Sequence, residues 1–136
     1  MNPAPMPYIT ALYAGLIGLL LLATAVPISH LRYSRKISLG DGGDKELGRA
    51  IRVHGNLVEW GMPALVLLLV AELTRAPVLL LHACGIALVV GRVLHALGLS
   101  RRGGTSTGRM LGTALSWIVL LALALWNVWA FTRTGL

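Results

Sequence analysis

Four apolar stretches, each long enough to cross a lipid bilayer, constrain this chain more than any other feature of its sequence. The first stretch begins near Ile9, and no charged side chain precedes Arg32. At 1.5 Å per residue, about 20 residues of helix span a hydrocarbon core of about 30 Å. The pattern predicts an all-α integral membrane protein, a four-transmembrane-helix bundle that forms one domain over residues 1–136. The expected helices cover residues 9–31, 47–73, 77–99 and 108–131.

The composition excludes an ordinary soluble domain. Hydrophobic residues make up 56% of the chain and charged residues 12%, whereas about a quarter of the residues in soluble domains are charged. The first apolar run has no Lys or Arg before it and is followed by further apolar runs, so we interpret it as a membrane span rather than a signal peptide. The single Cys84 lies within an apolar run and excludes a disulfide framework within one chain.

The basic residues lie between the apolar runs, although a net charge of +7 by itself is also typical of nucleic-acid binding. This placement predicts membrane lipid headgroups as partners and no nucleic acid. By the positive-inside tendency, the loops 32–47 and 100–108 are cytoplasmic and both termini are outside. On the outer side, Glu72 and Arg75 are expected to form an ion pair. Nine of the twelve basic residues flank the two cytoplasmic loops: Arg32, Arg35, Lys36, Lys45, Arg49, Arg52, Arg101, Arg102 and Arg109.

Three polar residues share one face of the second predicted helix. At 100° per residue, Asn56 lies about 40° and Glu59 about −20° around the helix from Arg52. Glu59 lies about 18 Å along the helix from Leu47, which is well inside the bilayer. A charged side chain at the centre of a membrane helix costs about 2.5 to 3.5 kcal/mol. We therefore expect this face to contact protein or a water-filled cavity.

Polar residues of two other helices are expected at the same depth. Arg92 and His95 lie one turn apart near the inner end of the third helix, and Arg109 begins the fourth. One interpretation is structural, with Glu59 paired to Arg52 or Arg92 to hold the helices together. The other is functional, because several arginines facing one glutamate leave an excess of positive charge. Guanidinium groups suit carboxylates, so the second interpretation predicts an anionic ligand.

The motif R-x-x-x-N-x-x-E at Arg52, Asn56 and Glu59, followed by Pro63, resembles the MAPEG family, the membrane-associated proteins in eicosanoid and glutathione metabolism. The segment R-V-L-H-A-L-G-L at residues 92–99 resembles its bacterial members, and the resemblance covers essentially the whole chain. It implies a homotrimer in the bacterial inner membrane. It also implies that glutathione binds between neighbouring subunits at the cytoplasmic end.

The resemblance also implies roles for individual residues. Matched position by position, Arg52, Asn56 and Glu59 are glutathione-binding residues. Arg92 and His95 stand where the family has an arginine and often an aromatic residue, and we assign them to the same site. Arg109 matches, by approximate position, the catalytic arginine that faces the thiol of glutathione. Glutathione would be a co-substrate, and no metal is expected.

The activity implied is that of a glutathione-dependent membrane transferase or peroxidase, which conjugates or reduces hydrophobic electrophiles or lipid hydroperoxides. Lowering a thiol pKa of about 8.5 by two units requires about 2.7 kcal/mol, which one or two desolvated arginines can supply. The alternative is a non-catalytic membrane module that binds lipid or a partner protein. Trp60 and Leu99 stand at positions where some family members carry tyrosine. The absence of those hydroxyl groups argues against catalysis and favours the alternative. A third hypothesis is a haem-binding electron carrier. It is disfavoured because no two histidines have ligand spacing on one predicted helix.

Overall fold

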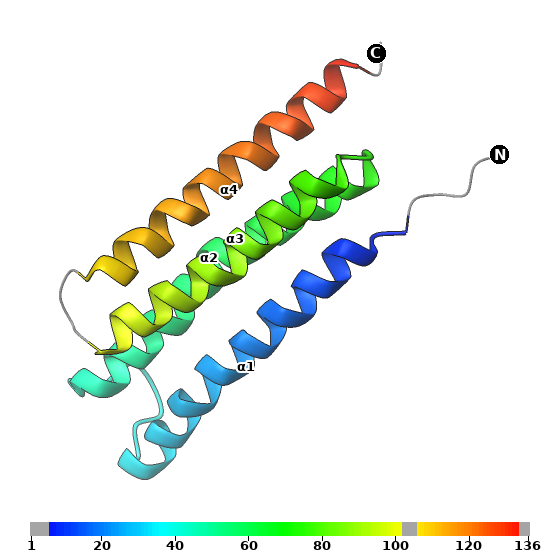
Figure 1. Ribbon diagram of the computed structural model, residues 1–136. Coiled ribbons are helices and arrows are strands. Elements are labelled where there is room, and N and C mark those ends of the chain that lie inside the picture. Colours follow the sequence, from blue (N-terminus) through cyan, green and yellow to red (C-terminus); the bar gives the residue numbers. More distant parts are fainter. Residues whose placement is uncertain (1–5, 102–105, 134–136) are drawn as a thin grey trace.

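The computed structural model describes residues 6–101 and 106–133, which form four helices and no strand. The helices are α1 (Tyr8–Arg35), α2 (Lys45–Leu73), α3 (Val78–Arg101) and α4 (Thr107–Thr132). Each is long and apolar enough to cross a membrane. Figure 1 shows that they run side by side with alternating direction, and that α2 and α3 lie between α1 and α4. The prediction of an all-helical, four-span chain is confirmed.

The two helices flanking the first connection are longer than predicted because backbone groups are capped at their ends. α1 continues through Arg35 and stops at Lys36, which adopts a left-handed conformation with φ of 54°. α2 begins at Lys45 because the Asp44 carboxylate accepts hydrogen bonds from the backbone N–H groups of Glu46 and Leu47, both at 2.9 Å. The connection is therefore shorter than the sequence pattern indicates.

The basic ends of all four helices lie together. Figure 1 shows the end of α1, the start of α2, the end of α3 and the start of α4 at one end of the bundle. The start of α1, the α2–α3 connection and the end of α4 lie at the opposite end. This arrangement is what an even number of spans requires. The assignment of the basic end to the cytoplasm stays a prediction.

The apolar side chains divide between an internal core and an outward surface. Large apolar side chains also cover the outside, among them Leu19, Leu79 and Leu121, each more than half exposed. Such a surface is unfavourable in water but matches lipid chains. The core takes at least one buried residue from each helix: Ile17, Leu57, Leu68, Leu88, Val119 and Leu123.

Glycines allow α3 and α4 to approach backbone to backbone. A Cβ atom added at Gly98 would lie 2.7 Å from the backbone nitrogen of Arg109, and one added at Gly112 would lie 2.8 Å from that of His95. Neither distance is compatible with a real side chain, because Cβ atoms do not approach backbone this closely. The contact therefore requires glycine, and it sets the level at which Arg109 and His95 face each other.

Glu72 caps α1 from α2, so the predicted ion pair between Glu72 and Arg75 is wrong. The carboxylate is 8% exposed and accepts hydrogen bonds from the backbone N–H groups of Ile9 at 2.9 Å and Thr10 at 2.6 Å. Pro7, the residue before α1, offers no side-chain cap. The negative charge at the positive end of the α1 dipole replaces that cap. Arg75 is exposed in a left-handed turn with φ of 61°.

We predict that Glu72→Ala destabilises the folded chain by about 1 to 3 kcal/mol, because the buried Thr10 N–H and the partly buried Ile9 N–H lose their acceptor. Glu72→Gln, which keeps one carbonyl oxygen, should cost less. Thermal unfolding followed by circular dichroism in detergent measures both effects. Arg75→Ala is the control and should leave the midpoint unchanged; an equal loss in Arg75→Ala would restore the ion-pair interpretation.

Candidate functional site

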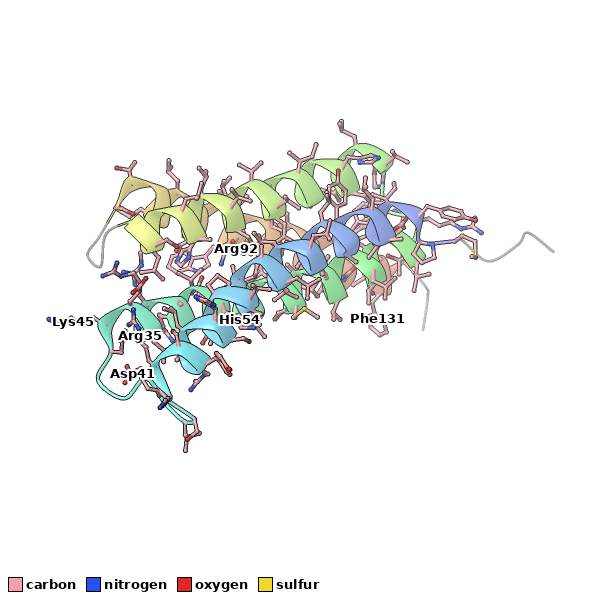
Figure 2. The ribbon with its side chains drawn as sticks, turned by 90° about the horizontal axis from the view of Figure 1, so that it is seen from below. Arg35, Asp41, Lys45, His54, Arg92 and Phe131 are labelled. Atoms are coloured by element: carbon pink, nitrogen blue, oxygen red, sulfur yellow. The ribbon has the colours of Figure 1, made fainter. Side chains whose placement is uncertain are left out.

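Arg92 of α3 ties together three helices at the centre of the candidate site. The residue is 2% exposed, and Figure 2 shows it among the helices. Its Nη1 donates to Oδ1 of Asn56 on α2 at 2.8 Å, and its Nη2 donates to the Gly112 carbonyl oxygen on α4 at 2.7 Å. The forked guanidinium makes this bridge possible, because its donors point in two fixed directions.

No carboxylate neutralises Arg92. The ion pairs among the described residues join Arg35 to Asp44 and Glu46, and Arg52 to Glu59. The bonded partners of Arg92 are neutral oxygens, and its buried Nε–H group has no hydrogen-bond partner. A buried charge with neutral partners alone is costly, and an anion placed beside it would recover part of that cost.

His95 lies one turn after Arg92 and is 4% exposed. α4 lies directly against it, since a Cβ atom added at Gly112 would lie 2.7 Å from the Cβ atom of His95, and Arg109 is one turn before Gly112 on the same helix. Among the described residues, Arg52 is paired with Glu59 but no ion pair neutralises Arg92 or Arg109, so this region carries an excess of positive charge. Such a region attracts carboxylates and thiolates.

The predicted polar face of α2 divides in the structure. Asn56 is half-buried and faces α3, whereas the side chains of Arg52 and Glu59 are 64% and 53% exposed. Arg52 Nη1 lies 3.6 Å from Glu59 Oε1. Asn56 is about 40° around the helix from Arg52 and about 60° from Glu59, which is enough to turn it inward. The expectation that Arg52 and Glu59 contact protein is therefore not met within one chain.

Arg109 lies beside an apolar groove. It is half-buried in the first turn of α4, where the hydroxyl of the N-cap residue Ser106 accepts from its backbone N–H at 3.3 Å. The indole of Trp117 lies 6.3 Å from that of Trp60 on α2, measured between ring centroids. This arrangement puts a guanidinium at the edge of a groove open to the lipid-facing side. The groove has a volume of about 370 Å³ and is lined by Arg109, Met110, Thr113, Ala114 and Trp117.

The site contains a group that sequence reasoning missed. The Gly112 carbonyl oxygen accepts from Arg92 and also from the Ser116 hydroxyl at 2.9 Å. Backbone carbonyls leave no mark in a sequence. Gly112 itself, one turn after Arg109, was the available signal, since glycine in a membrane helix often marks close helix contact.

Two of the four histidines, His54 and His82, form hydrogen bonds between helices. Nδ1 of His54 lies 2.9 Å from the Thr24 hydroxyl, and Nδ1 of His82 lies 2.8 Å from the Tyr13 hydroxyl. Within residues 6–101 and 106–133, no group of three or more His, Cys, Asp or Glu side chains is placed to hold a metal ion. These contacts give His54 and His82 a packing role.

We predict that Arg92→Lys destabilises the chain by about 1.5 to 3 kcal/mol, because one ammonium cannot reach acceptors on both α2 and α4. Arg52→Lys is the matched control and should change stability by less than about 1 kcal/mol, since its ion pair is exposed. Unfolding midpoints in detergent measure both. Equal effects of the two substitutions would contradict the central place of Arg92.

The chain matches known proteins over nearly its whole length. The model of the MAPEG family matches residues 10–129. The inner membrane protein YecN of Escherichia coli strain K12 is 40% identical over 121 residues, which cover 89% of this chain and 91% of that relative. YecN of Escherichia coli O6:H1 gives the same figures. The four spanning helices and these relatives make the chain an inner-membrane protein. By the extent of both matches, it belongs to the MAPEG family.

Proposed function

We propose that the chain is a glutathione-dependent membrane enzyme that conjugates or reduces hydrophobic electrophiles, lipid hydroperoxides among them. The observation that supports this most strongly is Arg92, a buried cation that forms no ion pair among the described residues and that contacts the helices carrying Arg52 and Arg109. Glutathione carries two carboxylates, one ammonium and an ionisable thiol. Its charges complement a site that is rich in arginine and holds one glutamate.

Binding would exchange one set of polar contacts for another. The exposed pair of Arg52 and Glu59 opens to accept a zwitterion, with a glutathione carboxylate on the arginine and the ammonium on the glutamate. Arg92 and Asn56, already joined at 2.8 Å, receive the second carboxylate together with His95. The free Nε–H of Arg92 supplies one hydrogen bond. Because Arg92 and His95 are buried, the helices around them must part to admit the second carboxylate.

Arg109 would stabilise the thiolate, which is the nucleophile. In conjugation, the sulfur forms a bond to an electrophilic carbon as the leaving group departs. In peroxide reduction, the sulfur attacks the distal oxygen, the O–O bond breaks, and the proximal oxygen takes a proton and leaves as the alcohol. A second glutathione then reacts with the sulfenic acid to give the disulfide and water. The groove lined by Met110 and Trp117 would hold the apolar acceptor.

A homotrimer would complete the site. Glu59 is exposed on α2 at a depth where a charge facing lipid costs about 2.5 to 3.5 kcal/mol, and its partner Arg52 is exposed nearer the helix start. Apolar neighbours on the same helix, Val58 and Met62, are also exposed. Contact with a second copy of the chain would cover this surface. The number three comes from the resemblance to the family.

We predict that purified protein in detergent converts bound glutathione to its thiolate, seen as an increase in ultraviolet thiolate absorbance. In Arg109→Ala the thiolate fraction should fall to a few per cent at neutral pH, as for a thiol of pKa about 8.5. Arg109→Lys should keep part of the signal, because it keeps the charge but loses the fork.

The control for this titration is Arg133→Ala. Arg133 lies at the opposite end of α4 with its guanidinium carbon 5.2 Å from the Trp129 ring centroid, so its loss should leave the signal intact. Absence of glutathione binding at millimolar concentration, with the protein shown to be folded, would reject the enzyme and favour the non-catalytic membrane module.

We predict that the detergent-solubilised protein has three times the 14.5 kDa mass of one chain in native mass spectrometry. Glu59→Lys places a second cation beside Arg52 on the exposed α2 face and should shift the population toward single chains. Arg75→Glu also changes an exposed charge, but at the other end of the bundle, and should leave the mass unchanged. A single-chain mass for the unsubstituted protein would contradict the trimer.

A further inference from the structure

A second basic groove lies at the end of α1, on residues that contribute nothing to the candidate glutathione site. Its volume is about 860 Å³, and it lies between the last two turns of α1 and the chain that follows. The lining combines two cations with an aromatic ring and three hydroxyl-bearing serines. The residues are Ser29, Arg32, Tyr33, Ser34, Lys36, Ile37 and Ser38.

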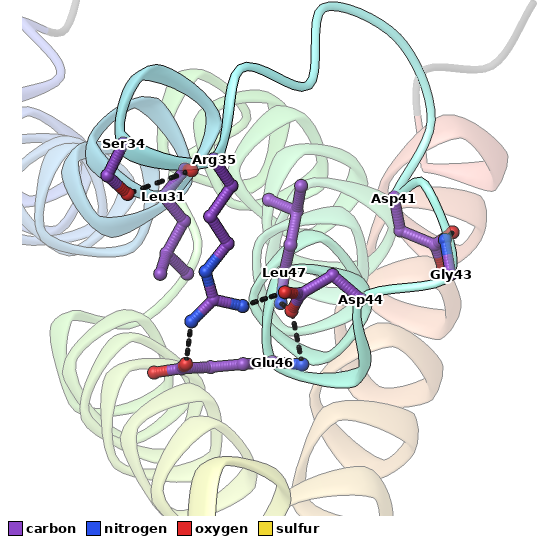
Figure 3. A network of polar contacts seen from close by, with 8 residues as sticks. All are labelled: Leu31, Ser34, Arg35, Asp41, Gly43, Asp44, Glu46 and Leu47. Atoms are coloured by element: carbon purple, nitrogen blue, oxygen red, sulfur yellow. Dashed lines mark hydrogen bonds and ion pairs between the residues drawn. The ribbon is translucent and has the colours of Figure 1, made fainter.

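Arg35 forms ion pairs with the nearby carboxylates. Figure 3 shows its guanidinium directed at Asp44 and Glu46, with which it forms two ion pairs. The Leu47 N–H holds the pKa of the Asp44 carboxyl below its ordinary value, and the bond from Arg35 acts in the same direction. Asp44 is therefore ionised at neutral pH, and its charge is committed to Arg35 and to the start of α2.

Arg32 and Lys36 consequently have no acidic partner among the residues that the structure describes. Asp41, the remaining acid of this connection, accepts from the Gly43 N–H at 3.0 Å. Arg32 donates one N–H to the Ile37 carbonyl oxygen at 3.4 Å, and its other N–H groups are available to a ligand. The groove therefore holds two positive charges that nothing in it neutralises.

The groove lies at the depth of the lipid headgroups. Ser29 is about 32 Å along α1 from Tyr8, close to the thickness of one hydrocarbon core. Tyr8 and Tyr33 are 72% and 88% exposed at the two ends of this helix. Exposed tyrosines near both ends of a span mark the two membrane interfaces.

An apolar stripe on α1 leads into the groove. Leu22 and Val26, 62% and 64% exposed, share one helix face with Ser29 and Tyr33, since spacings of four, three and four residues repeat on a helix. An acyl chain lying along Leu22 and Val26 would bring its headgroup to Ser29. Free phosphate would use the cations but not the stripe.

We propose that this groove binds the phosphate headgroup of an anionic phospholipid. The Arg32 fork and the Lys36 ammonium contact the phosphate oxygens, the hydroxyls of Ser29 and Ser38 contact the glycerol part of the headgroup, and one acyl chain follows the stripe. The bound lipid neutralises the two cations and anchors the end of α1 at the membrane surface.

Native mass spectrometry of the detergent-solubilised protein, titrated with phosphatidylglycerol or with phosphatidylcholine, tests this site. We expect preferential retention of phosphatidylglycerol, weakened roughly fivefold for each cation removed in Arg32→Gln, Lys36→Asn and the double variant. Asparagine is chosen at position 36 because it tolerates the left-handed conformation found there. Circular dichroism verifies the fold of each variant, and the two single variants test the site if the double variant does not fold.

The matched control is the double variant Lys45→Gln/Arg49→Gln, which loses the same charge from the same end of the bundle. It should retain phosphatidylglycerol as the unsubstituted protein does. Equal retention of the two lipids by the unsubstituted protein would overturn the proposal, and so would an equal loss in the control. Displacement of the lipid by millimolar glycerol phosphate would also overturn it, since the site would then take a free phosphate ester.

Discussion

The buried guanidinium of Arg92 is the interaction on which the rest of the site depends. Its charge lies between α2, α3 and α4 and is held there by neutral oxygens of Asn56 and Gly112. A carboxylate in place of these neutral oxygens would neutralise the guanidinium charge, and an anionic ligand would gain little by binding beside it. The fold instead holds the cation with neutral oxygens, so the group ties the helices together, and under the proposed function its charge remains available to an anion.

Hydrogen bonds between helices set the depth at which each one lies. Glu72 holds the start of α1, Tyr13 meets His82 between α1 and α3, and Thr24 meets His54 between α1 and α2. In a membrane each such bond contributes only about 0.6 kcal/mol on average, because the polar groups also find hydrogen-bond partners in the unfolded state within the membrane. These hydrogen bonds are directional and so fix the position of one helix along another, whereas apolar contact alone lets the helices slide. Fixed depths are what allow groups of three helices to meet at Arg92.

The apolar runs and the 3.6-residue period were enough to predict the four helices. The same reasoning failed for Glu72, because it considered the nearest opposite charge in sequence, Arg75, three residues along. In the structure the chain leaves α2 at that point, and the backbone N–H groups of Ile9 and Thr10, more than sixty residues away, are closer. Backbone donors at the start of another helix carry no sequence signal, so only the packing reveals them.

What the sequence by itself determined is the class of protein and the identity of its polar groups: four spans and a basic end to which all four helices contribute arginine, because hydropathy and charge are properties of residues in order. The tertiary structure alone decided how those groups are used. Arg92 and Asn56 turn inward together, whereas Arg52 and Glu59, within the same arc of α2, turn outward as a pair. The difference is a few tens of degrees around one helix, and the close packing of α2 against α3 and α4 decides which side of the contact each residue takes.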